Sequence, residues 1–245
     1  MNTMLIKTSK TFFKALTIGL CISSGSVLSQ TLPLSSNLVG FNTPEGEKLL
    51  VESKSKEDFF PLIMQFTTQN NQAYCGVASM VMVLNSLQIP APEALQYKPY
   101  RVFTQENFFN NNAKKVLTPE VVSQQGMTLD QLGKLLASYD LKVNVYHAAD
   151  TSLEQFRKQA AENLKQPQNF ILVNYLRKEI GEEKGGHISP LAAYNEQTDR
   201  FLILDVSRYK YPPVWVKTAN LWKAMLTNDP SSNKSRGFVF ISKSL

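Results

Sequence analysis

The sequence predicts a single α+β domain, because helical spacing dominates its first half and strand-like runs dominate its second. With 245 residues, of which 43% are hydrophobic and 19% charged, the chain can bury one substantial core. This composition excludes a disordered protein and a small disulfide-stapled protein. The two cysteines, Cys21 and Cys75, and the two histidines, His147 and His187, lie far apart in the sequence and do not form the closely spaced ligand pairs of a structural zinc finger.

The first 29 residues match the pattern of a secretory signal peptide. Three lysines precede an apolar run over residues 15–28, and no acidic residue occurs before Glu45. Cleavage after Ser29 would export the protein, into a bacterial periplasm, with no stable membrane span. The apolar run is shorter than the roughly 20 residues that cross a bilayer. Cys21 leaves a lipoprotein as the alternative, although Leu20 is larger than that signal prefers.

Removal of this leader changes the charge and the cysteine count of the mature chain. The leader carries three lysines and no acid, so the formal charge falls from +6 to +3. That balance gives no reason to predict nucleic-acid binding. Cys75 is then the single thiol of a protein in an oxidising compartment, where it has no intrachain partner.

The first half of the mature chain is predicted to be mainly helical. Residues 30–59 are polar and irregular and predict an N-terminal surface arm that leads into a domain over 60–245. The apolar residues of 73–87 recur at helical spacing and also fill the opposite side, which predicts a buried helix. A loop-rich segment follows over 90–115. Further helices are predicted at 119–125, 129–138 and 153–165, from a proline-first start and two capping-box pairs.

The second half is predicted to form an antiparallel sheet. Alternating apolar residues over 141–145 predict one strand, and the continuous apolar run over 169–176 predicts a covered strand. Residues 188–194 and 200–206 flank a polar turn and predict a hairpin. A helix at 220–226 and a strand at 237–242 close the chain.

Cys75 is the first candidate catalytic residue, because it lies where the buried helix begins. Free backbone N–H groups and the helix dipole favour a thiolate at that point, and the thiolate is the nucleophilic form. The following Gly76 would allow close approach of another chain or a substrate. The alternative is a cysteine that merely packs in the core, which is common for this residue.

His187 and Asp205 are the candidate base and its orienting acid. His187 follows a polar, glycine-rich loop at the start of the predicted hairpin, and Asp205 interrupts the apolar run of its second strand. If the residue numbers of paired positions in the hairpin add up to an even number, both side chains lie on one face within hydrogen-bonding reach. An odd sum would place them on opposite faces. Asp205 could instead cap local backbone. His147, the other histidine, continues the parity of Val143 and Val145 and is predicted to be a half-buried strand residue.

Together these residues supply a nucleophile, a base and an orienter in the order that papain-like proteases use. His187 would take the proton of Cys75 and later protonate the leaving amine, while Asp205 fixes the imidazole. Gln69, six residues before Cys75, could donate a side-chain N–H to the oxyanion.

Four stretches of the chain resemble the catalytic domain of phytochelatin synthases, papain-like enzymes that act on glutathione. They are QAYCGVAS at 72–79, GGHISP at 185–190, LDVSRYKYPPVW at 204–215 and RGF at 236–238. The resemblance implies a papain-like cysteine protease fold, in which the helical part that carries the cysteine packs on an antiparallel sheet that carries His187 and Asp205. It also assigns Cys75, His187, Asp205 and Gln69 the roles given above.

The resemblance implies acyl transfer from glutathione. Cys75 would attack the Cys–Gly amide, release glycine and hold a γ-glutamylcysteinyl thioester, which passes to water or to a second glutathione. A pocket for this acyl group needs a partner for its free α-carboxylate, and arginine binds a carboxylate with a bidentate fork. The candidates are Arg177 and Arg236, followed by Asn174, Arg208 and Gly186. Each arginine could instead be an exposed, solubilising charge.

The resemblance also shapes the expected partners. Eukaryotic members carry a cysteine-rich C-terminal region, and this chain ends at Leu245 without one. We therefore expect no tightly bound cofactor, and cadmium or zinc would enter as the glutathione thiolate co-substrate. Hydrolysis of glutathione is expected to dominate over phytochelatin synthesis. The chain could also form a homodimer. The alternatives are a general papain-like peptidase and a non-catalytic, exported protein that binds thiol peptides or their metal complexes.

Overall fold

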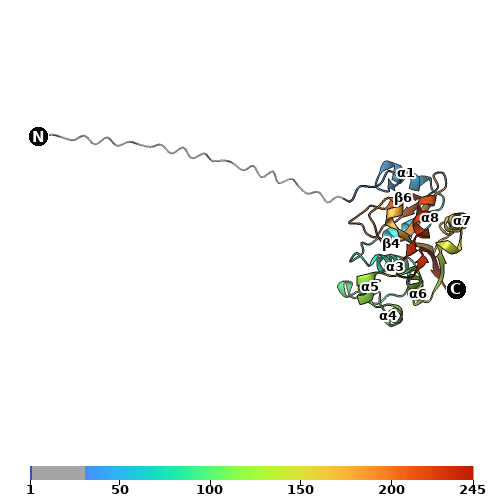
Figure 1. Cartoon of the computed structure of the whole chain (residues 1–245). Coiled ribbons are helices and arrows are strands. Elements are labelled where there is room, and N and C mark those ends of the chain that lie inside the picture. Colours follow the sequence, from blue (N-terminus) through green and yellow to red (C-terminus); the bar gives the residue numbers. More distant parts are fainter. Residues whose placement is uncertain (2–30, 245) are drawn as a thin grey trace. The chain divides into compact units, whose positions relative to one another are not determined.

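The computed structural model describes Met1 and residues 31–244 (Figure 1). The predicted signal peptide and its cleavage bond therefore lie, apart from Met1, outside the described residues. Thr31–Leu245 forms one compact unit. Within the described part of the chain, no helix has the length and apolar character needed to cross a membrane.

A seven-stranded sheet forms the centre of this unit, and each pair of neighbouring strands is antiparallel. It confirms the predicted α+β class and the predicted strands, except that the strand predicted over 200–206 ends at Ile203, before Asp205. In spatial order the strands are β1 (Val39–Gly40), β6 (Val214–Lys217), β5 (Arg200–Ile203), β4 (Gly186–Asn195), β3 (Asn169–Leu176), β9 (Gly237–Lys243) and β2 (Leu141–His147).

Helices cover both faces of the sheet. On one face the core joins side chains of α3 to sheet residues such as Leu172 and Ile188. On the other face Phe156 and Trp222 pack with Phe201. The first face carries α1 (Pro44–Glu52), α2 (Phe59–Met64), α3 (Cys75–Ser86), α4 (Asn111–Val116), α5 (Pro119–Gln125) and α6 (Leu129–Ala137), and the second carries α7 (Leu153–Asn163) and α8 (Thr218–Leu226). In Figure 1, α7 and α8 lie together at the right, and α4, α5 and α6 gather at the lower end.

Short elements connect these layers. They are the 3₁₀ turns η1 (Leu95–Tyr97), η2 (Ala148–Asp150) and η3 (Arg177–Ile180), and a small hairpin of β7 (Asn228–Asp229) and β8 (Lys234–Ser235). The turn η3 leads from β3 into β4, and the β7–β8 hairpin leads from α8 into β9. Both connections border the candidate active site.

The predicted helix starts are confirmed by their caps. Thr118 caps α5 ahead of its proline, and Gly126 ends that helix at a φ of +70°. Thr128 and Gln131 form the full reciprocal capping box of α6. Ser152 caps α7, although the side chain of its partner glutamine bonds elsewhere. The buried helix is confirmed as α3, whose residues 75–84 are all buried.

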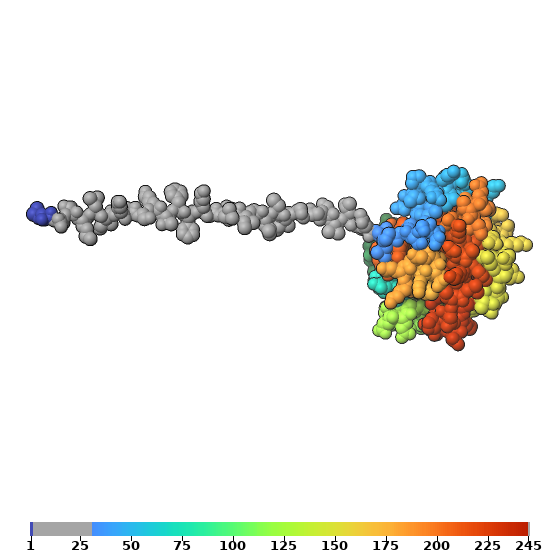
Figure 2. Space-filling model, turned by 45° about the horizontal axis from the view of Figure 1, so that its top comes forward, coloured from blue at the N-terminus to red at the C-terminus, as the bar shows by residue number. Residues whose placement is uncertain are grey.

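The N-terminal arm is not the irregular surface segment that its composition predicts. Strand β1 extends the main sheet, and α1 begins at Pro44 with Thr43 as its cap. Trp215 of β6 donates from Nε1 to the carbonyl of Gly46, which ties α1 to the sheet. In Figure 2 the blue surface of α1 accordingly adjoins the orange residues near position 200. The signal was available, since Thr43-Pro44 repeats the threonine–proline start of α5. The helix α4, capped by Asn110, was likewise missed within the loop-rich segment.

Candidate active site

Cys75 is the first residue of α3 and lines a cavity of about 550 Å³. His187 lines the same cavity, so the structure brings the predicted nucleophile and base together. Burial alone would raise the pKa of the Cys75 thiol. The charge of His187, hydrogen bonds to His187 and to the Ile188 backbone, and the charge of Arg177 outweigh burial and lower that pKa. These groups therefore stabilise the thiolate at a cysteine whose burial alone would disfavour it.

His187 is the second residue of β4, and its carboxylate partner lies just beyond β5. A bulge between Leu191 and Ala193 shifts the register of the two strands. Nε2 of His187 donates to Oδ1 of Asp205 at 2.9 Å. Burial opposes a charged imidazole, but the carboxylate of Asp205 and the thiolate of Cys75 outweigh it and raise the pKa of His187 to about 9. The geometry favours an imidazolium held between two anions.

Asp205 is fully buried and accepts several hydrogen bonds. Oδ1 accepts from the backbone N–H of Ser207 at 2.7 Å and from Nη2 of Arg177 at 2.9 Å, in addition to His187. Burial alone would raise the pKa of Asp205, but His187 and Arg177 hold it well below its usual range. The carboxylate therefore stays ionised and its orientation is fixed from three sides.

Arg177 does not line the cavity, contrary to its prediction as a substrate-carboxylate partner. It is 3% exposed, and its guanidinium bonds to Glu182 and to Asp205. A second contact joins Nη1 to Oδ2 of Asp205 at 2.7 Å, and the ring of Tyr211 lies 5.4 Å from the guanidinium carbon. The sequence could not show this, because the partner acids lie 5 and 28 positions away. In the described structure Arg177 belongs to the support of the triad.

Gln69 lies near the triad, but its amide is occupied. Nε2 donates to the carbonyl of Asn71 at 2.6 Å and to the hydroxyl of Tyr209 at 3.1 Å. Its Oε1 accepts from the hydroxyl of Ser207 at 2.7 Å. Gln69 is not among the residues that line the cavity with Cys75. Its oxyanion role stays a prediction, and it would require the contact with Tyr209 to open.

Arg236 lines the cavity together with Asn174 and Gly186, and their role in substrate binding stays a prediction. Its Nη1 donates to Oδ1 of Asn174 at 2.9 Å and lies 3.7 Å from Oδ2 of Asp229. A Cβ at Gly186 would come within 2.6 Å of the same Nη1, so a side chain there would displace the guanidinium from this position. Nε of Arg236 has no hydrogen-bond partner among the described residues. That nitrogen is itself buried, so the contribution of Arg236 to the cavity is its guanidinium charge.

Asp229 also lines the cavity, and sequence reasoning missed it. It is the last residue of β7, in the connection before β9, and is 7% exposed. In the sequence Asp229 has the context of an ordinary polar turn, and in the structure its Oδ1 does accept from the backbone N–H of Ser231. The signal that could have found it is its spacing of seven residues from Arg236, across a hairpin that returns the chain to the same edge.

Two other candidates lie outside the cavity. Arg208 is exposed, and its guanidinium carbon stacks 4.8 Å from the centre of the Phe66 ring. His147 is partly buried, as predicted, and bonds to Asp130 at 2.9 Å and to the Ser235 carbonyl at 2.6 Å. Both ring nitrogens of His147 are therefore engaged away from Cys75.

The comparison with known families agrees with this arrangement. A family model described as Phytochelatin synthase matches residues 29–238. The chain belongs to the phytochelatin synthase family. Two relatives from Arabidopsis thaliana are named glutathione gamma-glutamylcysteinyltransferase 2 and 1. They are 35% and 34% identical over 86% and 91% of this chain, which cover 46% and 45% of their own length. A third, glutathione gamma-glutamylcysteinyltransferase 3 from Lotus japonicus, is 32% identical over 91% of this chain and 46% of its own.

This member of the phytochelatin synthase family thus spans less than half the length of those curated relatives. Among solved structures, the N-terminal peptidase C39-like domain of a toxin secretion ATP-binding protein from Vibrio parahaemolyticus aligns with 69% of this chain and 97% of its own. The TM-score is 0.35 and the identity 14%, a likeness too distant to define the fold.

The motifs that resemble the family meet around the site. The stretch 72–79 supplies the start of α3, and 185–190 supplies the start of β4. The stretch 204–215 carries Asp205 and then Tyr211, whose ring covers Arg177 and whose hydroxyl accepts from the Glu183 N–H at 2.9 Å. Motifs that lie more than a hundred residues apart in the sequence therefore form one constellation.

Proposed function

We propose that this chain is a papain-like thiol acyltransferase that cleaves glutathione at its Cys–Gly amide and transfers the γ-glutamylcysteinyl group. The observation that carries the proposal is one cavity that holds Cys75, His187 and Arg236, with Asp205 bonded to the imidazole. A thiol, an imidazole and a cationic side chain that could pair an acyl carboxylate thus line the same cavity. The names of the relatives, each a glutathione gamma-glutamylcysteinyltransferase, support the choice of substrate.

The first half-reaction forms a thioester. The Cys75 thiolate attacks the carbonyl carbon of the Cys–Gly amide, and the C=O π electrons move onto oxygen. When the tetrahedral intermediate collapses, the C–N bond breaks and His187 gives its proton to the leaving nitrogen, so that glycine departs as the amine. Asp205 keeps its negative charge throughout and stabilises the imidazolium until that proton leaves.

The second half-reaction consumes the thioester. His187, now neutral, takes a proton from water or from the amine of a second glutathione, and that nucleophile attacks the thioester carbonyl. Collapse releases the Cys75 thiolate, with γ-glutamylcysteine or a phytochelatin as the product. Cadmium or zinc would reach this step as the thiolate complex of glutathione, as a substrate.

The polar wall of the cavity fits the zwitterionic end of a γ-glutamyl group. Arg236, which lines the cavity, would pair the α-carboxylate through its guanidinium. Asp229, on the same wall, would accept from the α-ammonium group. An α-linked glutamyl peptide lacks this free pair of charges at its side-chain end, so the wall would favour the γ-linkage.

The test is to incubate the mature protein with glutathione, with and without cadmium, and to identify the products by mass spectrometry. Cys75→Ala is the control for the enzyme, and the α-linked isomer Glu-Cys-Gly is the control for the substrate. We expect glycine and γ-glutamylcysteine, with longer γ-glutamylcysteine repeats if transfer competes with water. Equal cleavage of both isomers would indicate a general peptidase, and glutathione left intact would contradict the proposal.

A further inference from the structure

Four buried charged groups meet behind the catalytic cavity, and two of them, Arg177 and Glu182, take no part in the steps of the proposed mechanism. Arg177, His187 and Asp205 are 3%, 4% and 0% exposed. Glu182, in the loop between η3 and β4, is 7% exposed as a residue, and its side chain is fully buried. Buried charges are costly unless each is paired, so their arrangement is informative.

Asp205 is shared between two cations. Its Oδ1 accepts from both His187 and Arg177, at 2.9 Å in each case, and its Oδ2 lies 2.7 Å from Nη1 of Arg177. If Arg177 had no other counter-charge, its guanidinium would draw the Asp205 carboxylate away from the imidazole. The protonated form of His187 would then be disfavoured. The triad therefore needs the charge of Arg177 to be balanced from another side.

Glu182 lies on that other side. Its Oε2 accepts from the same Nη1 of Arg177. The loop holds it there through backbone bonds from Glu182 N–H to the Arg177 carbonyl at 3.1 Å and from Arg177 N–H to the Gly185 carbonyl at 3.0 Å. Gly185 then leads directly to His187. The charged and titratable groups that act on Glu182 from the packed elements are Arg177, Asp205, His187 and Tyr175.

We propose that Glu182 is a positioning residue of the triad, which neutralises Arg177 so that the charge of Asp205 stays with His187. The four groups then form two ion pairs, Glu182 with Arg177 and Asp205 with His187. Burial raises the pKa of Glu182 to about 7, against the opposing charge of Arg177, so the balance is complete above neutral pH. The inference rests on the triad of the proposed function but not on the identity of the substrate.

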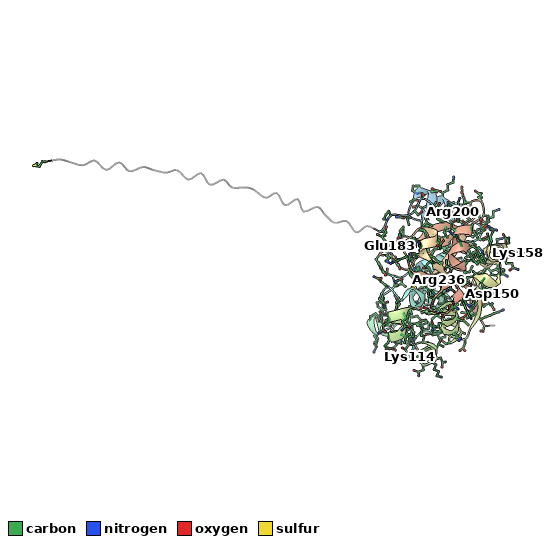
Figure 3. All side chains as sticks on the ribbon, viewed as in Figure 1. Lys114, Asp150, Lys158, Glu183, Arg200 and Arg236 are labelled. Carbon is green, nitrogen blue, oxygen red and sulfur yellow. The ribbon has the colours of Figure 1, made fainter. Side chains whose placement is uncertain are left out.

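The test is the pKa of His187 itself, read by NMR of untagged protein labelled at histidine. The chain has only two histidines, so the spectrum is simple, and His187→Ala assigns the signals. We expect Glu182→Gln to lower the pKa of His187 by about one pH unit, because it leaves Arg177 unbalanced. Glu183→Gln is the matched control. It makes the same charge change in the same loop, but the Glu183 side chain, labelled in Figure 3, is exposed. Its carboxylate pairs with Lys210 at 3.3 Å.

An unchanged His187 pKa in folded Glu182→Gln would overturn the proposal, as would an equal shift in Glu183→Gln. If Glu182→Gln fails to fold, Arg177→Met/Glu182→Gln removes the pair together and should leave the pKa of His187 near its wild-type value. A large fall in that double variant would also overturn it. Because no substrate is present, the result stands apart from glutathione turnover. A protein that fails to cleave glutathione but shows these shifts would contradict only the proposed function.

Discussion

His187 and Asp205 lie on the same face of the β4–β5 hairpin because a bulge in β4 shifts the register of the two strands by one residue. Near the turn Tyr194 pairs with Phe201, and this register continued would place the two residues on opposite faces. Past the bulge Leu191 pairs with Ile203, which makes them diagonal neighbours on one face. The 2.9 Å bond between them depends on that single extra residue.

The first prediction concerns the ionisation of Cys75. His187 lowers the pKa of Cys75, and its own pKa is raised to about 9, so the two groups favour a thiolate–imidazolium pair below about pH 9. We expect iodoacetamide to alkylate Cys75 at pH 6.5 nearly as fast as at pH 8. An ordinary thiol, with a pKa of roughly 8.5, would react at about 1% of its full rate at pH 6.5.

His187→Ala is the control for this measurement, and peptide mapping assigns the label to Cys75. The variant should lose most of the reaction at pH 6.5 and regain it above pH 8.5. Equal profiles for the two proteins would show that the imidazole does not activate the thiol.

The second prediction concerns the acyl-group pocket. Arg236→Met removes the charge that would bind the substrate carboxylate, and a charged hydrogen bond contributes about 1.5–3 kcal/mol. We expect kcat/KM for glutathione to fall by about 10- to 100-fold. The matched control is Arg208→Met, since Arg208 is exposed, stacks on Phe66 and does not line the cavity. Similar losses in both variants would remove the specific role of Arg236.

The third prediction tests the fit of Gly186 against the same guanidinium. A methyl group at Gly186 would lie 2.6 Å from Nη1 of Arg236 and force it to move. Gly186→Ala should therefore reduce kcat/KM as Arg236→Met does, while the pH profile of Cys75 alkylation stays that of the wild type. A variant with full activity would show that the guanidinium can shift without loss.

The fourth prediction concerns Asp58, a buried carboxylate before α2. It is 0% exposed, and neither of its oxygens has a hydrogen-bond partner in the described structure. Burial, and then the charge of Glu57, raise its pKa from 3.8 to about 9. The folded state thus binds this proton more tightly than the unfolded state, and its stability falls as pH rises from about 4 to about 9.

Asp58→Asn removes that ionisation cost. We expect it to raise the free energy of unfolding at pH 7 by about 2–4 kcal/mol and to flatten its dependence on pH, as measured by urea denaturation. Glu57→Gln, an exposed neighbour with the same charge change, should have little effect. Equal stability of Asp58→Asn and wild type across pH 6–9 would contradict the account of this residue.

Much of the fold followed from local patterns. Thr128 with Gln131, the apolar run of β3 and the all-round apolar helix α3 are short-range signals, and each element formed where its pattern placed it. The triad could also be chosen from residue types alone. The thiol lies at the start of an apolar helix, the imidazole at the start of an apolar strand and the carboxylate just after one. Each is therefore a chemically reactive residue beside an apolar run.

The support of the triad could not be predicted in this way. The parity of the hairpin depends on the bulge at Ala192, which no turn or propensity signal marks. Arg177 has the sequence context of an exposed cation, and only the tertiary fold buries it against Asp205 and Glu182. Whether such a residue is buried or exposed depends on charged partners that are distant in the sequence. A short stretch of sequence does not show these partners.

The central claim is a covalent acyl-enzyme on Cys75, and intact-protein mass spectrometry after rapid acid quench tests it most directly. Glutathione is mixed with the protein, and the adduct is mapped by peptide digestion. The account predicts that the protein gains one γ-glutamylcysteinyl group on Cys75 within the first turnover, and that Cys75→Ser neither gains it as a thioester nor releases glycine. Release of glycine without an adduct at Cys75, or at the wild-type rate in Cys75→Ser, would contradict it.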